Sequence, residues 1–270
     1  MIIALKLIVM KIAIYSKENN TQIVELIKAE SNKYGFSFDD KNPDVVFSVG
    51  GDGTFLRAVH EYLNQADHIK FIGINSGSLG FLYDFSKEDI PSIMKNLNEE
   101  KCDVKNLKLL QGDIRFKNSE QTIYALNEIR LENPFHTLIS EVFIDDELLE
   151  TYRGNGLIVS SSLGSSAYNK SLGGALIDTD LDALELTEIA GIENNIYRSL
   201  GSSLVIKGDK KVTFSGNLAK SVVGNDHLNI ENDDILEKVT IYYSNKSVKI
   251  IYKKDHSYVQ KIRKSFVLWY

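Results

Sequence analysis

The feature that most constrains the fold is the change of pattern between residues 45 and 63. Residues 45–49 form an apolar, largely β-branched run, as in a buried strand of a parallel sheet. Gly50-Gly51-Asp52-Gly53-Thr54 follows directly, and residues 55–63 then carry apolar side chains at helical spacing. Glycines permit a tight turn and close approach of a ligand, and a helix that begins here directs its first N–H groups at the turn. The pattern predicts a phosphate-binding loop in which Asp52 can contact an acceptor hydroxyl or a phosphate-bound metal.

The same glycines would also suit a plain strand-to-helix turn with an aspartate cap. Four features in order, namely a buried strand, Gly-Gly, Asp-Gly-Thr and an amphipathic helix, favour phosphate binding over that alternative.

Composition limits the other possibilities. The 270 residues suffice for one large domain or two modest ones, and 43% hydrophobic and 25% charged residues are ordinary for a globular protein. A net charge of −6 argues against a nucleic-acid binder with a broad basic surface. The single cysteine, Cys102, excludes an internal disulfide and a cysteine zinc site, and fits a reducing cytoplasm.

The N-terminus is apolar, but Lys6 and Lys11 interrupt it and no small-residue cleavage pattern follows. We therefore expect neither a signal peptide nor a membrane span. The chain could start at Met1 or at Met10.

Two kinds of periodicity divide the chain. Strands are predicted at residues 11–15, 45–49 and 69–75, and helices at 21–34, 55–63 and 86–97. Short strands then dominate, with one helical segment predicted at residues 182–190. The predicted fold class is an α/β N-terminal doubly wound sheet plus a mostly antiparallel β-sandwich C-terminal domain. We expect domains at 1–104 and 105–254, with 255–270 docking back on the first.

Two stretches of the second domain indicate binding. Asn127 and Glu128 interrupt an apolar strand, where burial is costly unless both are hydrogen-bonded. They suit the two hydroxyls of a ribose, although an edge strand with a solvated face would also explain them. Residues 152–174 form a Ser/Gly-rich loop that contains Tyr168 and Leu172. Those embedded side chains favour a binding loop over a flexible linker.

These motifs together resemble the NAD kinase family, especially its small bacterial members. The first motif alone is shared with diacylglycerol, sphingosine and phosphofructo-kinases, whereas the stretch from Ala167 to Gly174 is far more specific. The matching stretches, in order, are residues 50–54, 73–75 with 77–81, 127–128, 153–157 and 164–174.

The resemblance implies a role for each matching residue. Asp52 would be the catalytic carboxylate facing the adenosine 2′-hydroxyl, with Gly53 beside it. Phe81 would border the adenine pocket. The resemblance further implies a phosphate loop of Gly50, Gly51 and Thr54; ribose contacts from Asn127 and Glu128; a nicotinamide end at Arg153 and Asn155, across a subunit contact; an adenosine site of Ser166, Ala167, Tyr168, Asn169, Lys170 and Ser171; and further dinucleotide contacts at Ala190, Ile192 and Asn225.

The implied reaction transfers a phosphoryl group from ATP, or polyphosphate, to the 2′-hydroxyl of NAD and gives NADP. A divalent cation, expected to be Mg²⁺, would assist, and its protein ligands are not assigned. The resemblance also implies a cytoplasmic homotetramer or homodimer. No nucleic-acid or membrane partner is expected.

Two departures from the family pattern stand out. Asn155 occupies a position where the family usually carries aspartate, and Leu163, just before Gly164 in the Ser/Gly-rich loop, removes one hydroxyl. Two alternatives follow. A lipid kinase would want an apolar or basic membrane-facing patch, which this acidic chain lacks; a non-catalytic dinucleotide sensor is favoured by Asn155 but disfavoured by the intact Asp52.

Overall fold

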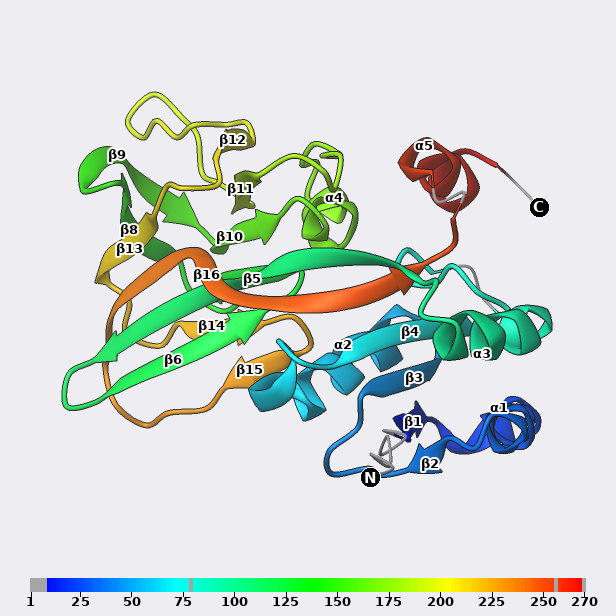
Figure 1. Cartoon of the computed structure of the whole chain (residues 1–270). Helices are drawn as coiled ribbons and strands as arrows, with labels where there is room; N and C mark the ends of the chain where they lie inside the picture. Colours follow the sequence, from blue (N-terminus) through cyan, green and yellow to red (C-terminus); the bar gives the residue numbers. More distant parts are fainter. Residues whose placement is uncertain (1–8, 78–79, 255–256, 269–270) are drawn as a thin grey trace. The chain divides into compact units, whose positions relative to one another are not determined.

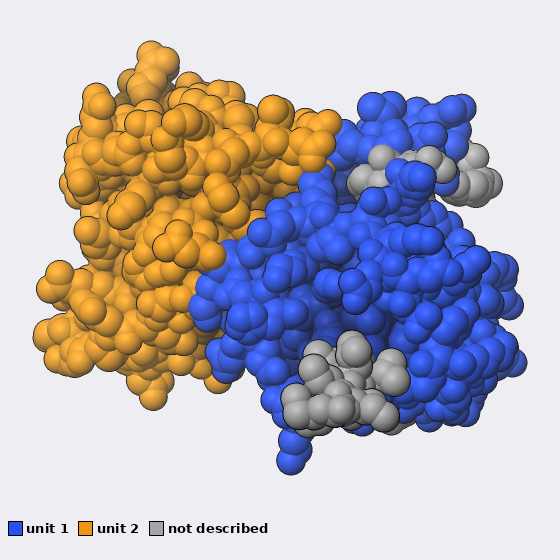
Figure 2. Space-filling view, in the orientation of Figure 1, with its two compact units in different colours: residues 1–107, 246–270 blue, residues 108–245 orange. Residues whose placement is uncertain are grey.

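The computed structural model describes residues 9–77, 80–254 and 257–268. The chain divides into two compact units (Figure 2). Unit 1 comprises residues 1–107 and 246–270, and unit 2 comprises residues 108–245. The domain boundaries expected from the sequence, after residues 104 and 254, stay predictions.

Unit 1 is a parallel sheet with helices (Figure 1). Its strands run in the order β2-β1-β3-β4-β16, and all pairs along this order are parallel. The strands are β1 (Lys11–Ser16), β2 (Ser37–Phe38), β3 (Val45–Gly50), β4 (Lys70–Asn75) and the last part of β16 (Leu236–Tyr252). The helices are α1 (Thr21–Lys33), α2 (Asp52–Glu61), α3 (Ile90–Asn98) and α5 (Tyr258–Ile262), with a π-helical turn at Arg263–Val267 and 3₁₀ turns at Glu18–Asn20, Leu63–Gln65 and Lys87–Asp89.

Helices cover both faces of this sheet. Every residue of β3 is buried, as expected for a strand covered on two sides. Ile27 of α1 and Met94 of α3 share one core with Phe47 of β3. On the opposite face, Phe55 of α2 packs on Phe71 of β4 with ring centroids 6.1 Å apart. Ligands of such sheets bind beyond the carboxyl ends of the strands, which directs attention to the loops after β3 and β4.

Unit 2 is mostly antiparallel. One sheet has the order β12-β11-β10-β7-β14-β15, and the other contains β5, β6, β8, β9, β13 and part of β16. The second-unit strands are β5 (Asp103–Phe116), β6 (Glu120–Ala125), β7 (Glu128–Glu132), β8 (Leu138–Ile144), β9 (Glu147–Gly154), β10 (Gly156–Ser161), β11 (Ala183–Ile189), β12 (Leu204–Lys207), β13 (Val212–Asn217), β14 (Val222–Asn225) and β15 (Leu228–Ile230). A 3₁₀ turn at Gly164–Ser166 leads into the short helix α4 (Tyr168–Ser171). The predicted fold class is confirmed.

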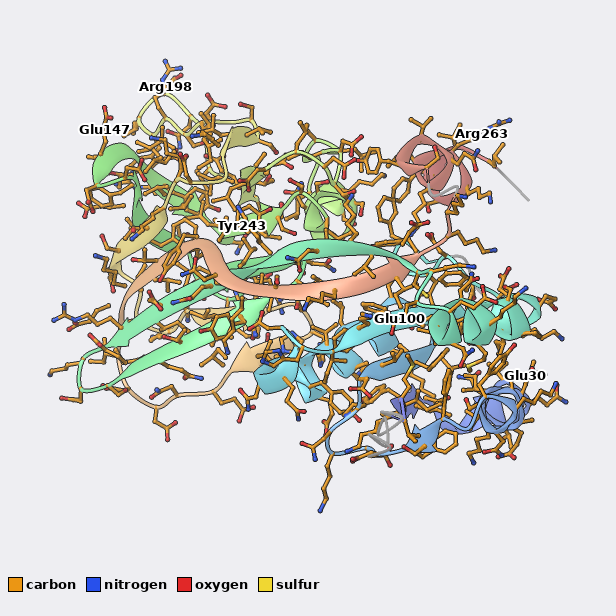
Figure 3. All side chains as sticks on the ribbon, in the orientation of Figure 1. Glu30, Glu100, Glu147, Arg198, Tyr243 and Arg263 are labelled. Atoms are coloured by element: carbon orange, nitrogen blue, oxygen red, sulfur yellow. The ribbon has the colours of Figure 1, made fainter. Side chains whose placement is uncertain are left out.

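The core of unit 2 draws apolar side chains from both sheets. Leu157 and Leu186 contribute from one sheet, and Phe214 and Val239 from the other. Tyr243 of β16, labelled in Figure 3, donates to the carbonyl of Ala183 and accepts from the N–H of Ser162. Polar groups that join the two sheets are thus hydrogen-bonded, as burial requires.

The helix predicted at residues 182–190 is wrong. This segment is strand β11, paired on both sides with β10 and β12. Leu184 and Leu186 alternate with Glu185 along it, and the leucines enter the core. Ala, Leu and Glu favour helices in isolation, but pairing on two sides overrides that weak preference. The apolar stretch of residues 122–130 is not one continuous strand, because the chain bends at Leu126 and Asn127 between β6 and β7.

None of the helices in the described part of the chain has the length and apolar character needed to span a bilayer.

Replacing Phe214 with alanine tests the core of unit 2. Phe214 has no exposed surface, so Phe214→Ala should lower the free energy of unfolding by about 3–5 kcal/mol. Phe135 is 89% exposed, so Phe135→Ala should cost no more than about 0.5 kcal/mol. Urea titration monitored by fluorescence measures both. Equal effects would contradict the assigned core.

Candidate functional site

The glycine loop joins β3 to α2 in unit 1. Gly50 ends the strand with a φ of +156°, and a Cβ atom there would lie 2.6 Å from Thr54 Oγ1. Glycine is therefore needed for the threonine side chain to pack beneath the turn, where Thr54 is buried. Gly51 has extended backbone and precedes the first helical residue, Asp52. The sequence-predicted loop residues, Gly50 to Thr54, are thus held as one rigid turn.

Asp52 links this turn to the loop that follows β4. Its Oδ2 accepts the backbone N–H of Phe81 at 2.8 Å, and its Oδ1 accepts that of Leu82 at 2.9 Å. A Cβ atom on Gly80 would lie 2.5 Å from Asp52 Oδ1, so only glycine leaves room for the carboxylate. An ionised carboxylate offers about four lone-pair sites, so two bonded amides leave capacity for a further donor.

Tyr83 supports the turn from below. Its hydroxyl donates to the carbonyl of Gly51 at 3.0 Å and lies 3.0 Å from Ser48 Oγ. Burial raises the pKa of the Tyr83 hydroxyl well above its usual range, so it stays protonated and acts as a fixed donor.

Phe81, the predicted adenine neighbour, is buried against the C-terminal segment of the same unit. Its ring stacks on Phe266 with centroids 6.2 Å apart and meets Tyr258 edge-on at 6.0 Å. The ammonium of Lys261 donates to the Phe81 carbonyl and pairs with Asp84 at 2.8 Å. Ser78 and Leu79 of the predicted second loop motif lie outside the described residues.

In unit 2, the bend between β6 and β7 presents Asn127 and Glu128. The carboxylate of Asp226 accepts three successive backbone N–H groups, from Leu126 at 2.8 Å, Asn127 at 2.7 Å and Glu128 at 3.3 Å. The N–H of Asp226 in turn donates to the Glu128 carbonyl at 3.0 Å. A single buried carboxylate therefore fixes the bend that carries both predicted ribose-binding residues.

Several buried oxygens near this bend have no hydrogen-bond partner among the described residues. They belong to Glu128 (Oε2), Ser160 (Oγ) and Asn225 (Oδ1). Ser160 pairs with Glu128 across the strands, and Asn225 pairs with Ile129. Desolvation, reinforced by the nearby Asp226, raises the pKa of the Glu128 carboxyl to about 8. Buried polar atoms normally have partners, so these oxygens suit a ligand.

The Ser/Gly-rich loop of residues 164–174 folds onto the same sheet. A Cβ atom on Gly164 would collide with the backbone of Asn127, so the loop and the bend are in direct contact. Asn169 is fully buried and donates to Glu185 at 2.8 Å, while its Oδ1 accepts from Thr187 at 2.7 Å. These two hydrogen bonds hold the loop, and the ligand contact of Asn169 that the resemblance implies stays a prediction.

The other predicted loop residues differ in exposure. Ser166 donates to the carbonyl of Leu163 at 2.9 Å, and Tyr168 donates to Glu132 at 3.3 Å. Tyr168 and Ser171 are exposed, whereas Ala167 and Lys170 are half-buried. The exposed side chains of Tyr168 and Ser171 are therefore accessible to a ligand.

The predicted nicotinamide-end residues lie close together on unit 2. The N–H of Ile192 donates to the Arg153 carbonyl at 2.7 Å, and Asn155 Nδ2 donates to the Asn133 carbonyl at 3.2 Å. Ala190 has a φ of +50°, an unusual conformation for alanine. The Arg153 guanidinium stacks over the ring of Tyr197 at 4.4 Å.

Supporting residues that sequence reasoning missed are acidic. Asp226 belongs to none of the sequence motifs, and Glu185 lies in the segment predicted to be a helix. Glu150 and Glu188 both accept the N–H of Leu200 at 3.0 Å. Burial and the adjacent Glu188 raise the pKa of Glu150 to about 7. An isolated acidic residue leaves no periodic pattern in the sequence. Its supporting role is therefore recognised only from its contacts with residues distant in the chain.

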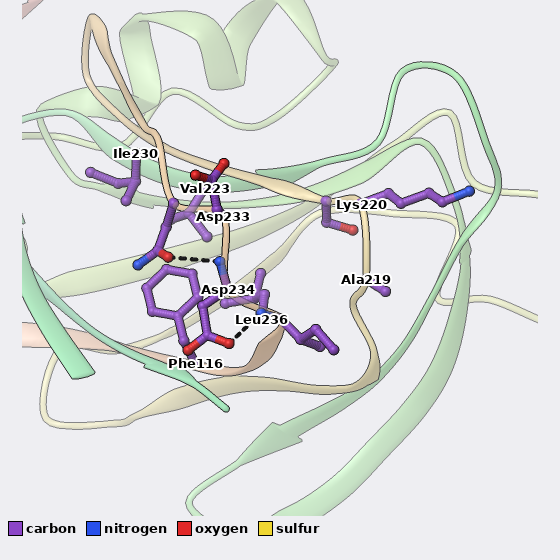
Figure 4. A pocket seen from close by; sticks show the side chains of 11 residues that line it. Phe116, Ala219, Lys220, Val223, Ile230, Asp233, Asp234 and Leu236 are labelled. Carbon is purple, nitrogen blue, oxygen red and sulfur yellow. Dashed lines mark hydrogen bonds between the residues drawn. The ribbon is translucent and has the colours of Figure 1, made fainter. Parts of the chain in front are cut away.

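A separate cavity of about 310 Å³ in unit 2, shown in Figure 4, contains none of the predicted site residues. Asn232 and Asp234 accept backbone N–H groups of Asp234 and Ile235 there, at 2.9 and 2.8 Å, and so hold the turn. Within residues 9–77, 80–254 and 257–268, no group of three or more His, Cys, Asp and Glu side chains could hold a metal.

A glycine loop between a parallel strand and a helix, as at residues 50–54, is typical of proteins that bind the phosphate groups of nucleotides. Residues 10–102 match the ATP-NAD kinase N-terminal domain, and residues 126–252 match the ATP-NAD kinase C-terminal domain. The chain is 34% identical to NAD kinase 1 of Bacillus anthracis, covering 96% of this chain and 99% of that protein. It is 36% identical to the NAD kinase of Lactobacillus helveticus, with 93% of each covered. The chain belongs to the NAD kinase family.

Solved structures share the fold. Yeast NADH kinase complexed with NADH has a TM-score of 0.85 at 18% identity, covering 97% of this chain and 89% of that one. An NAD kinase from Archaeoglobus fulgidus in complex with ATP has a TM-score of 0.76 at 22% identity, covering 95% and 97%.

Asp226→Asn tests the carboxylate that holds the bend. An amide has one acceptor oxygen in place of two, so at least one buried N–H loses its partner and stability should fall by about 1–3 kcal/mol. Hydrogen exchange should accelerate at residues 126–128. Asp233→Asn, an exposed acid in a nearby loop, is the control. Unchanged exchange in Asp226→Asn would refute this role.

The raised pKa of Glu128 predicts a pH dependence of stability. Between its ordinary value of 4.5 and about 8, the folded state holds a proton that the unfolded chain releases. The free energy of unfolding should therefore fall as pH rises through this window. Glu128→Gln stays neutral and lacks this contribution. Its free energy of unfolding, measured by urea titration, should therefore rise relative to that of the wild type from pH 5 to pH 8. A difference in stability between Glu128→Gln and the wild type that does not change with pH would contradict the assignment.

Proposed function

We propose that this chain is an NAD kinase that transfers the γ-phosphoryl group of ATP to the 2′-hydroxyl of NAD. Membership of the family supports the reaction, and the chain covers nearly the whole length of the curated relatives it matches. One structural observation carries the assignment of the chemistry. It is the Asp52 carboxylate, fixed at the start of α2 by the amides of Phe81 and Leu82.

Asp52 acts as the general base in this proposal. The NAD 2′-oxygen forms a bond to the γ-phosphorus of ATP, and the bond from that phosphorus to the β–γ bridging oxygen breaks. The electron pair leaves with ADP, and the hydroxyl proton passes to an Asp52 oxygen. Phosphoryl transfer has a loose transition state, so positioning and charge neutralisation supply most of the catalysis.

The glycine loop serves the donor. The first N–H groups of a helix have no acceptor within the helix, so the start of α2 can donate to phosphate oxygens. The rigid turn below it, fixed by Thr54 and Tyr83, keeps these donors in place. Gly53 is exposed beside Asp52, which allows a ligand to approach the backbone closely.

Unit 2 supplies the recognition of NAD. Asn127 and Glu128 bind ribose hydroxyls, and the unpartnered oxygens of Glu128, Ser160 and Asn225 support such a role. A neutral Glu128 carboxyl can both donate and accept a hydrogen bond. The loop of residues 166–171 binds the adenosine, with Asn169 positioning it through Glu185 and Thr187. Arg153, Asn155, Ala190 and Ile192 bind toward the nicotinamide, and Phe81 borders the adenine.

The donor ATP would bind together with a divalent cation, Mg²⁺. Mg²⁺ usually binds through one or two carboxylates together with substrate phosphates and water. The donor phosphates and water would therefore supply most of its ligands, and its protein ligands are not assigned. When bound, Mg²⁺ would neutralise negative charge on the transferred phosphoryl group.

The remaining biological assignments follow the family resemblance. The product is NADP, polyphosphate can replace ATP as donor, and the enzyme works in the cytoplasm as a homotetramer or homodimer. We propose no nucleic-acid or membrane partner, in keeping with the net charge of −6.

Asp52→Asn tests the proposed base. Loss of a positioned base should reduce turnover by about 10²–10⁴-fold, while NAD affinity stays within about twofold. Chromatographic detection of NADP formed from NAD, ATP and Mg²⁺ measures turnover, and calorimetry measures NAD binding. Asp40→Asn, at an exposed aspartate, is the control. Full turnover in Asp52→Asn would refute the role. Wild-type protein that binds NAD without forming NADP would instead indicate a sensor, and activity only with lipid vesicles would indicate a lipid kinase.

A further inference from the structure

A small cavity of about 160 Å³ lies in unit 1, beyond the ends of two neighbouring strands. β4 ends at Asn75 and β16 at Tyr252, and the two strands are parallel neighbours through the pairs Lys70–Lys249 and Phe71–Ile250. Asn75 lines the cavity, and its Oδ1 accepts the N–H of Gly77 at 2.8 Å. The cavity thus occupies the position where open parallel sheets bind ligands.

Three lysines make the cavity positively charged. Lys253, Lys261 and Lys264 line it, against the single carboxylate of Asp84. Lys261 pairs with Asp84 at 2.8 Å, and Lys253 pairs at 2.8 Å with Asp89, which lies outside the lining. Lys264 is exposed on the π-helical turn after α5. Its charge is not compensated by any ion pair seen within the described residues, so the cavity has an excess of positive charge.

The size of the cavity restricts its ligand. A volume of 160 Å³ equals about five water molecules at about 30 Å³ each. A space of this size accommodates one or two phosphoryl groups. Lysine ammonium groups are common phosphate ligands and act there as point charges.

Gly80 connects the cavity to the proposed base. Gly80 lines the cavity, and its missing side chain leaves the space that Asp52 Oδ1 occupies. Asp52 does not itself line the cavity, so a phosphoryl group there would be separated from the carboxylate by Gly80, a residue without a side chain. Such proximity is what a phosphoryl donor needs, because bringing the reacting groups together supplies much of the rate enhancement.

We propose that this cavity binds phosphoryl groups of the donor, and that Lys264 and Lys253 of the C-terminal segment are its cationic ligands. The proposal rests on the proposed kinase activity. It places part of the donor site on Lys253, Lys261, Lys264 and Ser265, whereas the glycine-loop motif accounts only for residues 50–54. ATP and inorganic polyphosphate share the phosphoanhydride chain that such a cavity recognises.

The test replaces Lys264, whose exposed side chain can be changed without disturbing the core. Lys264→Gln should raise the KM for ATP about tenfold or more, since a charge-assisted contact is lost, and Lys264→Glu should raise it further. Lys264→Arg keeps the charge and should restore most of the affinity. Lys95→Gln, an exposed lysine on α3 of the same unit, is the matched control and should leave the KM unchanged. NAD affinity by calorimetry should be the same in all variants.

A second measurement separates this proposal from the proposed activity. Calorimetry of the intact protein with inorganic tripolyphosphate should show binding that weakens about tenfold in Lys264→Gln and more in the double variant with Lys253→Gln. Tripolyphosphate binding that depends on these lysines, in a protein that forms no NADP, would support the cavity and overturn the activity. An active enzyme whose ATP KM and tripolyphosphate affinity are unchanged in both variants would overturn the cavity and leave the activity standing.

Discussion

The two hydrogen bonds from Phe81 and Leu82 to Asp52 are the constraint on which the organisation of unit 1 depends. They join the loops that follow two neighbouring parallel strands, so the positions of both loops are set by one carboxylate. Glycine at position 80 is a consequence, since any side chain would displace that carboxylate. An acid with this much backbone contact is held in one orientation, which general-base chemistry requires.

In unit 2, carboxylates likewise hold loops in place by accepting hydrogen bonds. Asp226 holds the bend of residues 126–128 through three backbone amides, and Glu185 holds Asn169 and the N–H of Ala175. In each case, a carboxylate remote in sequence satisfies backbone or amide groups of a loop. Neighbouring carboxylates thereby fix the loops whose side chains are expected to contact a ligand.

The sequence predicted the parts governed by local pattern. The parallel sheet of unit 1 follows from alternating apolar strands and amphipathic helices, and the turn at Gly50 follows from the glycines between strand and helix. β11 was mistaken for a helix because its Ala, Leu and Glu content outweighs a short alternation, and pairing with β10 and β12 is invisible from one segment. Asp226 and Lys261 act on residues about 100 and 180 positions away, respectively, which no local pattern can indicate.

The route of β16 has a consequence for how the protein is made. Residues 246–252 complete the parallel sheet of unit 1 beside β4, although the ribosome synthesises them after all of unit 2. A nascent chain that ends before them exposes one edge of β4, and an exposed edge is a template for wrong pairing. The sheet of unit 1 therefore stays incomplete during translation until residues 246–252 have been synthesised.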